Sequence, residues 1–301
     1  MHNIKRNFDK IYQTIKTLNL PDFDPEGNIV KVGRKPKLSD LEVISLNLTS
    51  EYMSIDSENL LFKKIKSCHC DDFPHLIDRT QFNRRKKNLF LYIDKIRMAL
   101  AQHFVEFEDF FIVDSMPLEI CKISREKRVN ICREACETSP DKGYCASQKI
   151  YFYGYKLHGV CSVNGVFHSI DLTKASVHDN EVLQDLNHQL SHCQLLGDKG
   201  YIGKEIQLDL FNTSAIRLYT PKRSNQKDYK PYPYVFRKTR KRLETLFSQL
   251  CDQFLIRRNY AKTFLGFRTR ILSKITALTL VQFINHFSMG RPLNQIKHAI
   301  F

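Results

Sequence analysis

Apolar residues recur at helical spacing through the N-terminal part of the chain. In the first segment the apolar positions are Ile4, Phe8, Ile11, Ile15 and Leu18. Their spacing predicts an amphipathic helix. A second helix is predicted after Ser39, because Glu42 follows at the spacing of a capping box. A long helix is predicted from Thr80 to about His103. We therefore expect residues 1–105 to form a helical region.

A break at 54–56 separates the Ser39 helix from another one predicted around Leu60, Leu61 and Ile65. This arrangement fits a helix-turn-helix that binds DNA. It fits equally well a helical hairpin that only packs on the core, because nothing in the sequence marks a recognition helix. The basic run at 83–88 suits either phosphate contacts or a solvated helix face. DNA binding by region 1–105 is our working hypothesis.

Beyond residue 105 the apolar runs become short and rich in aromatic and β-branched residues, which indicates strands. Strands are predicted at 110–113, 151–161, 166–172, 194–197 and 215–219, with a helix at 178–190. Strands interspersed with helices predict an α/β class. A further helix is predicted over 237–257, with an apolar face formed by Leu243, Leu246, Phe247, Leu250, Phe254 and Leu255. The apolar stretch at 275–287 is too short for a membrane span and predicts a packed helix.

Three carboxylates stand at informative places in this pattern. Asp114 follows the run 110–113 and is expected to end that strand, just before the turn-forming Pro117. Asp198 follows the run 194–197 in the same way, and ligands of open α/β sheets bind beyond the carboxyl ends of strands. Glu244 lies on the predicted helix at 237–257. We expect the three acids to form one metal site.

Taken singly, each acid has an ordinary structural interpretation. An aspartate after an apolar run is often a turn residue or a helix N-cap. Glu244 alone could be a surface residue paired with Arg240 or Arg242. Asp252, eight residues further along the same helix, is a rival third acid. Asp179 is a weaker rival, because an acid at the start of a helix is stabilised by the helix dipole.

Four short motifs follow one another in the order of a known family. They are Asp-Ser-x-Pro at 114–117, Gly-Tyr-Lys-Leu-His at 154–158, Ala-Ser-Val-His-Asp at 175–179 and Asp-Lys-Gly-Tyr at 198–201. With Glu244, they resemble the DDE transposases of bacterial insertion sequences, over most of the chain. Arg240 matches that family's pattern before the Glu, whereas Arg237 stands at its Tyr position and Cys251 at its Lys position. These departures place the resemblance closest to the insertion-sequence nine-eight-two family.

The resemblance implies a ribonuclease-H-like mixed sheet flanked by helices, with a catalytic domain at 106–260 and a C-terminal helical extension at 261–301. It implies that Asp114, Asp198 and Glu244 are catalytic and bind two Mg²⁺ or Mn²⁺ ions. It also implies DNA cleavage at the ends of a mobile element and joining of the 3′-hydroxyl to target DNA. A nuclease without strand transfer and a non-catalytic DNA-binding relic remain alternatives. His158 and His178 are expected to order groups around the site or to be structural.

The charge of the chain favours a polyanionic partner. There are 47 Lys and Arg against 32 Asp and Glu, a net charge of +15, and basic groups on phosphates release counterions. Region 221–242 concentrates Lys and Arg among Tyr229, Tyr232, Tyr234 and Phe236, a composition suited to DNA or to a solvated loop. Our DNA-binding candidates are Lys156, Lys199, Arg237, Lys238, Arg240, Lys241 and Arg242. Double-stranded DNA, carrying the terminal inverted repeats or the target, and a second copy of the chain in a synaptic homodimer are the expected partners.

The nine cysteines are odd in number and irregularly spaced, which argues against a secreted disulfide framework. No secretory signal opens the chain. We therefore expect a bacterial cytoplasmic protein associated with the nucleoid. Cys68-His69-Cys70 and the group Cys121, Cys132, Cys136 and Cys145 lack the paired knuckles of strong zinc motifs. A zinc clamp in the second group stays open.

Overall fold

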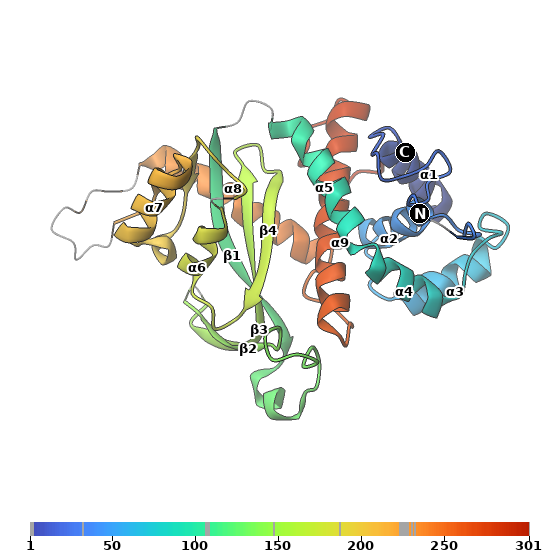
Figure 1. Ribbon diagram of the computed structural model, residues 1–301, viewed down its shortest axis with the longest axis horizontal. Helices are drawn as coiled ribbons and strands as arrows, with labels where there is room; N and C mark the ends of the chain where they lie inside the picture. The colour runs from blue at the N-terminus through green and yellow to red at the C-terminus, as the bar shows by residue number, and fades with distance from the viewer. Residues whose placement is uncertain are drawn as a thin grey trace. The chain divides into compact units, whose positions relative to one another are not determined.

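The computed structural model describes residues 3–31, 33–105, 109–146, 148–186, 188–222, 229, 231 and 233–300 (Figure 1). It divides the chain into two compact units. One comprises Met1–His103 together with Gln249–Phe301, and the other comprises Phe104–Ser248. The first unit is therefore built from both ends of the chain, whereas the second is one continuous segment.

Helices make up the first unit. They are α1 (Ile4–Lys16), α2 (Asp40–Tyr52), α3 (Glu58–Cys68), α4 (Arg79–Asn88), α5 (Phe90–Val105), α9 (Phe264–Phe283) and a π-helical turn at Ile284–Ser288. The capping box predicted for α2 is confirmed, because Ser39 and Glu42 each accept a hydrogen bond from the other's backbone N–H. The prediction of a single helix from Thr80 to about His103 is wrong, because this segment forms two helices. It breaks at Leu89, which is buried and leaves helical geometry.

A buried ionic cluster joins α2 to α9. Lys274 donates hydrogen bonds to Glu51 and to the backbone oxygen of Phe254, and Arg270 Nε lies 3.4 Å from Glu51. Asn47 donates to Ser273 at 2.7 Å in the same interface. Burying these charges costs free energy that only their pairing offsets, so the cluster fixes how α2 and α9 meet. In the described parts of the chain, no helix is both long and apolar enough to cross a membrane.

The second unit is built on a six-stranded sheet. Its strands are β1 (Phe110–Cys121), β2 (Asp141–Cys145), β3 (Ile150–Ser162), β4 (Phe167–Lys174), β5 (Gln194–Leu196) and β6 (Arg217–Tyr219). β3 pairs antiparallel with β1 on one edge and with β2 and β4 on the other, while β1, β5 and β6 are parallel. The path β4-β3-β1-β5-β6, with this mixture of directions, is the topology of a ribonuclease-H-like sheet. The predicted fold class is confirmed.

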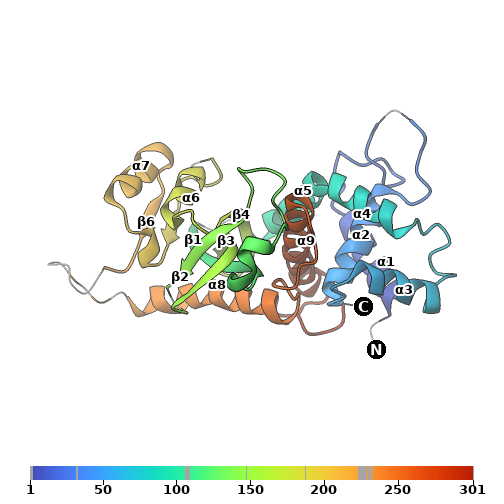
Figure 2. The same cartoon turned by 90° about the horizontal axis from the view of Figure 1, so that it is seen from below.

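Helices cover both faces of the sheet (Figure 2). On one face α6 (Asp179–Leu186) and α7 (Lys204–Ser214) bury an apolar cluster that includes Phe111, Val113, Val160, Leu183, Leu186, Leu195, Tyr201 and Leu210. On the other face lies α8 (Tyr234–Asp252). Its Phe236 packs 5.8 Å from Phe110, and its Phe247 packs 6.1 Å from Phe167, between ring centroids. Because side chains alternate along a strand, Ile112 and Asp114 face α8.

Strand β1 is longer than predicted. It does not end at Asp114 but continues to Cys121, because pairing with β3 extends to Cys121 opposite Tyr153. Pro117 is tolerated inside it because β5 pairs only with residues 110–112, which leaves the other edge of β1 without ladder bonds at the proline. Strand β2 was not predicted at all. Its sequence, Asp-Lys-Gly-Tyr-Cys, is polar and carries no strand pattern.

Candidate active site

Asp114 and Asp198 occupy equivalent places on neighbouring parallel strands. Ile112 of β1 is in register with Leu196 of β5, and each aspartate lies two residues further on. With a side-chain period of two, both carboxylates belong to the face covered by α8. The backbone N–H of Ser115 donates to Asp114 Oδ1 at 2.8 Å, and the N–H of Gly200 donates to Asp198 Oδ1 at 2.7 Å. Local backbone thus orients each acid.

Helix α8 brings the third predicted acid to the same face. Leu243, Leu246 and Leu250 are fully buried and fix the rotation of the helix. Glu244 itself is exposed. One turn earlier, the guanidinium of Arg240 reaches within 3.9 Å of Asp114 Oδ2. Its Nε is buried and has no hydrogen-bond partner within the part of the chain that the structure describes. Arg240 therefore offers an unused donor beside Asp114.

The acids share one electrostatic environment. Burial, with smaller contributions from the charges of Asp198 and Glu244, raises the pKa of the Asp114 carboxyl from 3.8 to about 7. The N–H of Ser115 and the guanidinium of Arg240 oppose this shift. Like charges held close together favour a bound cation, and carboxylate oxygens suit hard ions such as Mg²⁺ and Mn²⁺. Among the described residues, no group of three or more Asp, Glu, His or Cys lies close enough together to hold a metal ion, so the three acids share one face but are not drawn together into a metal site.

A fourth carboxylate, Asp179, lies beside the predicted triad. It opens α6, as the sequence suggested, but it also accepts hydrogen bonds from Lys156 at 3.0 Å and from Ser115 at 3.3 Å. A β-carbon at Gly200 would stand 2.9 Å from Asp198 Oδ1 and 3.1 Å from Asp179 Oδ2. Gly200 therefore lies against both acids, and the missing side chain leaves room for them.

The buried polar groups around Asp179 were largely missed by the sequence analysis. Tyr201 is fully buried, and its pKa is raised well above 10 by burial and by the charges of Asp179, Asp114 and Asp198. Ser115 and Tyr201 both lie inside the motifs quoted above, at 114–117 and 198–201. Their positions inside these motifs were the available signal, because a motif specifies the residues next to an acid as well as the acid itself.

The two predicted histidines occupy different environments. His158 is buried on β3, where its Nε2 lies 2.8 Å from the Thr173 hydroxyl and its Nδ1 lies 4.0 Å from Asp179. Burial lowers the pKa of His158 well below 6.5, so the ring is neutral near neutral pH. His178 is exposed. Its Nδ1 accepts the N–H of Asn180 at 3.3 Å, and it caps the start of α6.

The predicted DNA-binding residues fall into two groups. Lys156 is largely buried and bonded to Asp179 and to the carbonyl of Val177, whereas Lys199 is exposed next to Asp198. On α8, Arg240 turns toward Asp114, while Arg237, Lys238, Lys241 and Arg242 are exposed. Arg223, Lys227, Asp228, Lys230 and Tyr232 of the basic segment lie outside the described residues. The rival acid Asp252 ends α8, about 12 Å along the helix from Glu244.

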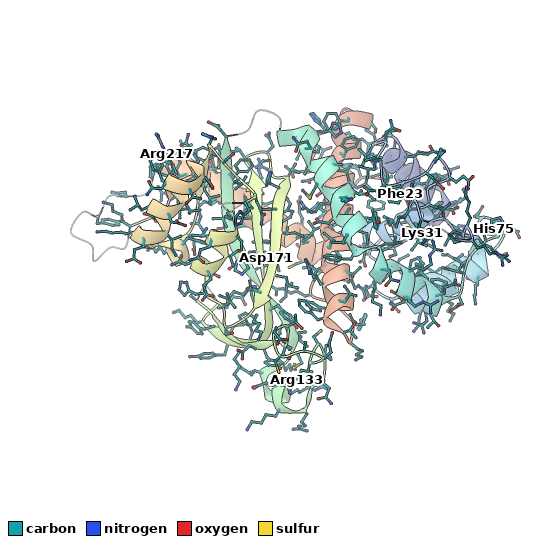
Figure 3. All side chains as sticks on the ribbon, in the orientation of Figure 1. Phe23, Lys31, His75, Arg133, Asp171 and Arg217 are labelled. Atoms are coloured by element: carbon teal, nitrogen blue, oxygen red, sulfur yellow. The ribbon has the colours of Figure 1, made fainter. Side chains whose placement is uncertain are left out.

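The cysteines between β1 and β3 do not converge on a metal site within the described residues. Cys132 is buried, and burial raises the pKa of its thiol to about 12. Hydrogen bonds hold this segment in place. Arg133 (Figure 3) donates to the Tyr153 hydroxyl at 2.7 and 3.0 Å, and Tyr155 donates to the carbonyl of Thr138 at 2.6 Å.

Comparison with known proteins identifies a family. A model described as "Transposase DDE domain" matches residues 106–280, which include all three predicted catalytic acids. No curated protein matches the chain. Among solved structures, "Mos1 transposase paired-end complex with left transposon end" is similar at 9% identity, over 82% of this chain and 86% of that one. Its TM-score is 0.22, too low to support a conclusion about this chain.

Proposed function

The chain belongs to the transposase DDE domain family, whose members are phosphoryl-transfer enzymes, and from this premise we propose that it is the transposase of a bacterial insertion sequence. Within that class, the departures at Arg237 and Cys251 favour the nine-eight-two family. Its substrates would be the terminal inverted repeats of its own element and a target DNA. The nucleoid of a bacterial cytoplasm is its proposed place of action.

One observation carries the catalytic assignment. Asp114 and Asp198 each stand two residues past the paired Ile112 and Leu196, and Glu244 lies on α8 one turn after Arg240, which reaches Asp114. This supports Asp114, Asp198 and Glu244 as ligands of two Mg²⁺ or Mn²⁺ ions. Such ions activate the attacking oxygen and stabilise the leaving 3′ oxygen of a phosphodiester.

The remaining groups have supporting parts in the proposed reaction. Water attacks first and frees a 3′-hydroxyl, which then attacks the target strand at the same site. Arg240 would turn its unused Nε donor to the scissile phosphate, where negative charge grows in the transition state. Exposed Lys199, beside Asp198, would hold the adjacent backbone. Asp179 would keep Lys156 and Ser115 in fixed positions behind the acids.

The exposed bases of α8 support a path for DNA beside the acids. Arg237, Lys238, Lys241 and Arg242 stand on the same helix as Glu244 and within two turns of it. Phosphates bound there would position DNA without reading its sequence. Because the two ends of an element must be brought together, a homodimer is the simplest proposed assembly.

The test is cleavage and joining of labelled DNA that carries the element's presumed ends, with Mg²⁺ or Mn²⁺. We expect nicking at the 3′ ends and joined products from the native chain and from Asp252→Asn, and neither from Asp114→Ala or Glu244→Gln. If Asp252→Asn lost activity while Glu244→Gln kept it, Asp252 would be the third acid. Cleavage without joining would indicate a nuclease, and DNA binding without either reaction would indicate a non-catalytic relic.

A further inference from the structure

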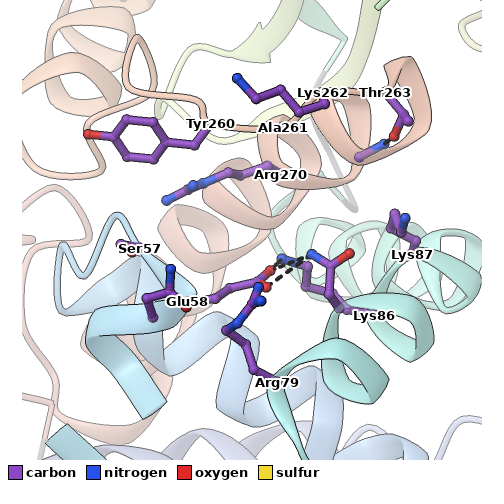
Figure 4. Close-up of a pocket in the computed structure, with 13 residues that line it drawn as sticks. Ser57, Glu58, Arg79, Lys86, Lys87, Tyr260, Ala261, Lys262, Thr263 and Arg270 are labelled. Carbon is purple, nitrogen blue, oxygen red and sulfur yellow. Dashed lines mark hydrogen bonds and ion pairs between the residues drawn. The ribbon is translucent and has the colours of Figure 1, made fainter. Parts of the chain in front are cut away.

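A basic pocket lies within the helical unit, and none of its lining residues belongs to the sheet unit. Its volume is about 570 Å³, and residues of α3, α4 and the segment from Tyr260 to Arg270 line it (Figure 4). Glu58 is the only acid among the lining residues. It is already engaged, because Lys86 bonds it and the Asn83 amide donates to it at 2.9 and 3.0 Å. The charge of the pocket is therefore strongly positive.

Three of the lining cations lack an acidic partner among the residues that the structure describes. Arg79, Lys87 and Lys262 form no ion pair with a carboxylate in the described parts of the chain. Arg270, in contrast, is buried and pairs with Glu51, so it belongs to the structural cluster beneath. Unpaired cations gathered in a concavity focus positive potential there. A polyanion is the ligand that this potential would attract.

The pocket continues along α3 into a second cavity of about 560 Å³, which shares the lining residues Asn59 and Arg79. This extension adds Lys63 and Lys66, both exposed and also unpaired among the described residues. Asn59, Lys63 and Lys66 stand at helical spacing on one face of α3. Counting the described residues alone, the combined groove carries five cations without an ion pair, more than a single phosphate ion could engage.

We propose that this groove, lined by Lys63, Lys66, Arg79, Lys87 and Lys262, binds the sugar-phosphate backbone of DNA as a second contact outside the catalytic unit. The proposal rests on DNA being the substrate, as put forward above, but not on catalysis. The extended shape and the number of unpaired cations favour a continuous backbone over a free phosphate ion. Contacts of this kind would add affinity and orientation without base specificity.

The chain supplies a matched control for the test. Lys63 and Arg79 line the groove, whereas Lys64 and Arg84 are exposed on the same two helices and do not line it. We would compare Lys63→Ala/Arg79→Ala with Lys64→Ala/Arg84→Ala, each in the Asp114→Ala background and without metal. Binding of a random-sequence duplex is then measured against salt concentration, so that the result does not depend on cleavage. Lys262→Ala, in a separate loop, repeats the test should the first pair fail to fold.

The groove variant is expected to bind duplex about tenfold more weakly at moderate salt, with a salt slope reduced by about two. The control pair should stay within about twofold of the parent. Equal weakening by both pairs, or none by the groove pair, would overturn the proposal. Inorganic phosphate titrated alone should show no saturable binding; saturable binding lost in the groove variant would make this a site for free phosphate instead. If the native chain bound DNA through the groove but neither cleaved nor joined it, the proposed enzyme function would be wrong and the groove proposal would stand.

Discussion

The ammonium group of Lys156 on β3 lies 3.0 Å from Oδ1 of Asp179, the first residue of α6. Both side chains are largely buried, and the same nitrogen also donates to the carbonyl of Val177 at 2.6 Å. This pair ties the centre of the sheet to the start of the helix that covers it. It also holds Asp179 in a fixed place behind Ser115 and Gly200.

Breaking this pair should destabilise the fold. Asp179→Asn and Lys156→Met are each expected to lower the free energy of unfolding by about 1–3 kcal/mol, because each leaves a charge with poor solvation. Urea unfolding of the two single variants and the double variant would give the coupling energy. We expect it to exceed about 1 kcal/mol. Additive effects would mean that the two groups do not stabilise one another in solution.

Asp198→Asn should abolish metal-dependent cleavage while leaving DNA affinity nearly unchanged. The asparagine oxygen can still accept the Gly200 N–H, so the turn is retained, but the negative charge is lost. A fall of at least about 10²–10³-fold in the cleavage rate is expected. Single-turnover cleavage and a binding assay on the same protein would separate the two effects. Undiminished cleavage would remove Asp198 from the site.

Divalent ions should stabilise the protein in a pH-dependent way. The pKa of Asp114 is raised to about 7 in the fold, so its ionisation costs stability as pH rises from about 4 to about 7. A bound ion would offset that cost, so Mg²⁺ should raise the melting temperature more at about pH 8 than at about pH 6. Asp114→Asn should raise metal-free stability at about pH 8 by on the order of 2–4 kcal/mol and remove most of the response to Mg²⁺. Calorimetry with and without the ion measures both.

His158 should make the protein acid-sensitive. Its pKa is lowered by burial, so the unfolded chain takes up a proton at higher pH than the folded one. The His158 contribution to the free energy of unfolding should therefore be fully present above about pH 6.5. It should fall by about 1–3 kcal/mol as the pH drops below that value. Unfolding measured across this range should show a flatter profile for His158→Gln. If the slopes of variant and native chain agree, another group causes the acid sensitivity.

The exposed bases of α8 should contribute to DNA binding. Lys238→Ala/Lys241→Ala/Arg242→Ala is expected to weaken duplex binding and to lower the salt slope by about two to three. A control of equal charge is Lys122→Ala/Lys127→Ala/Arg128→Ala, whose residues are also exposed in the same unit. An unchanged salt slope in the α8 variant would mean that this helix face contacts solvent and not DNA.

Local signals in the sequence were sufficient for several elements. The capping box of α2 and the apolar runs of β1 and β5 depend on neighbours in the chain, and the acids that follow these runs occupy the same face of the sheet. The end of β1 could not be predicted in this way. Pairing with β3 carries the strand past Asp114, and that partner lies some forty residues further on.

Features decided by packing were missed for a similar reason. The break at Leu89 leaves the helical apolar pattern intact, because Leu89 is itself buried. Strand β2 is polar and forms only because β3 offers its edge. Asp179 looked like a simple helix start, since its contact with Lys156 joins residues 23 positions apart.

The Glu51–Lys274–Arg270 cluster also bears on the order in which the chain can fold. Glu51 is buried near the start of the chain, but the cations that neutralise it lie on α9. The helical unit therefore cannot complete its core until α9, at Phe264–Phe283, has left the ribosome. The sheet unit is one uninterrupted segment, so it can form first. A chain truncated before α9 would leave α2 with an uncompensated buried charge, making premature termination products targets for proteolysis rather than free DNA-binding fragments.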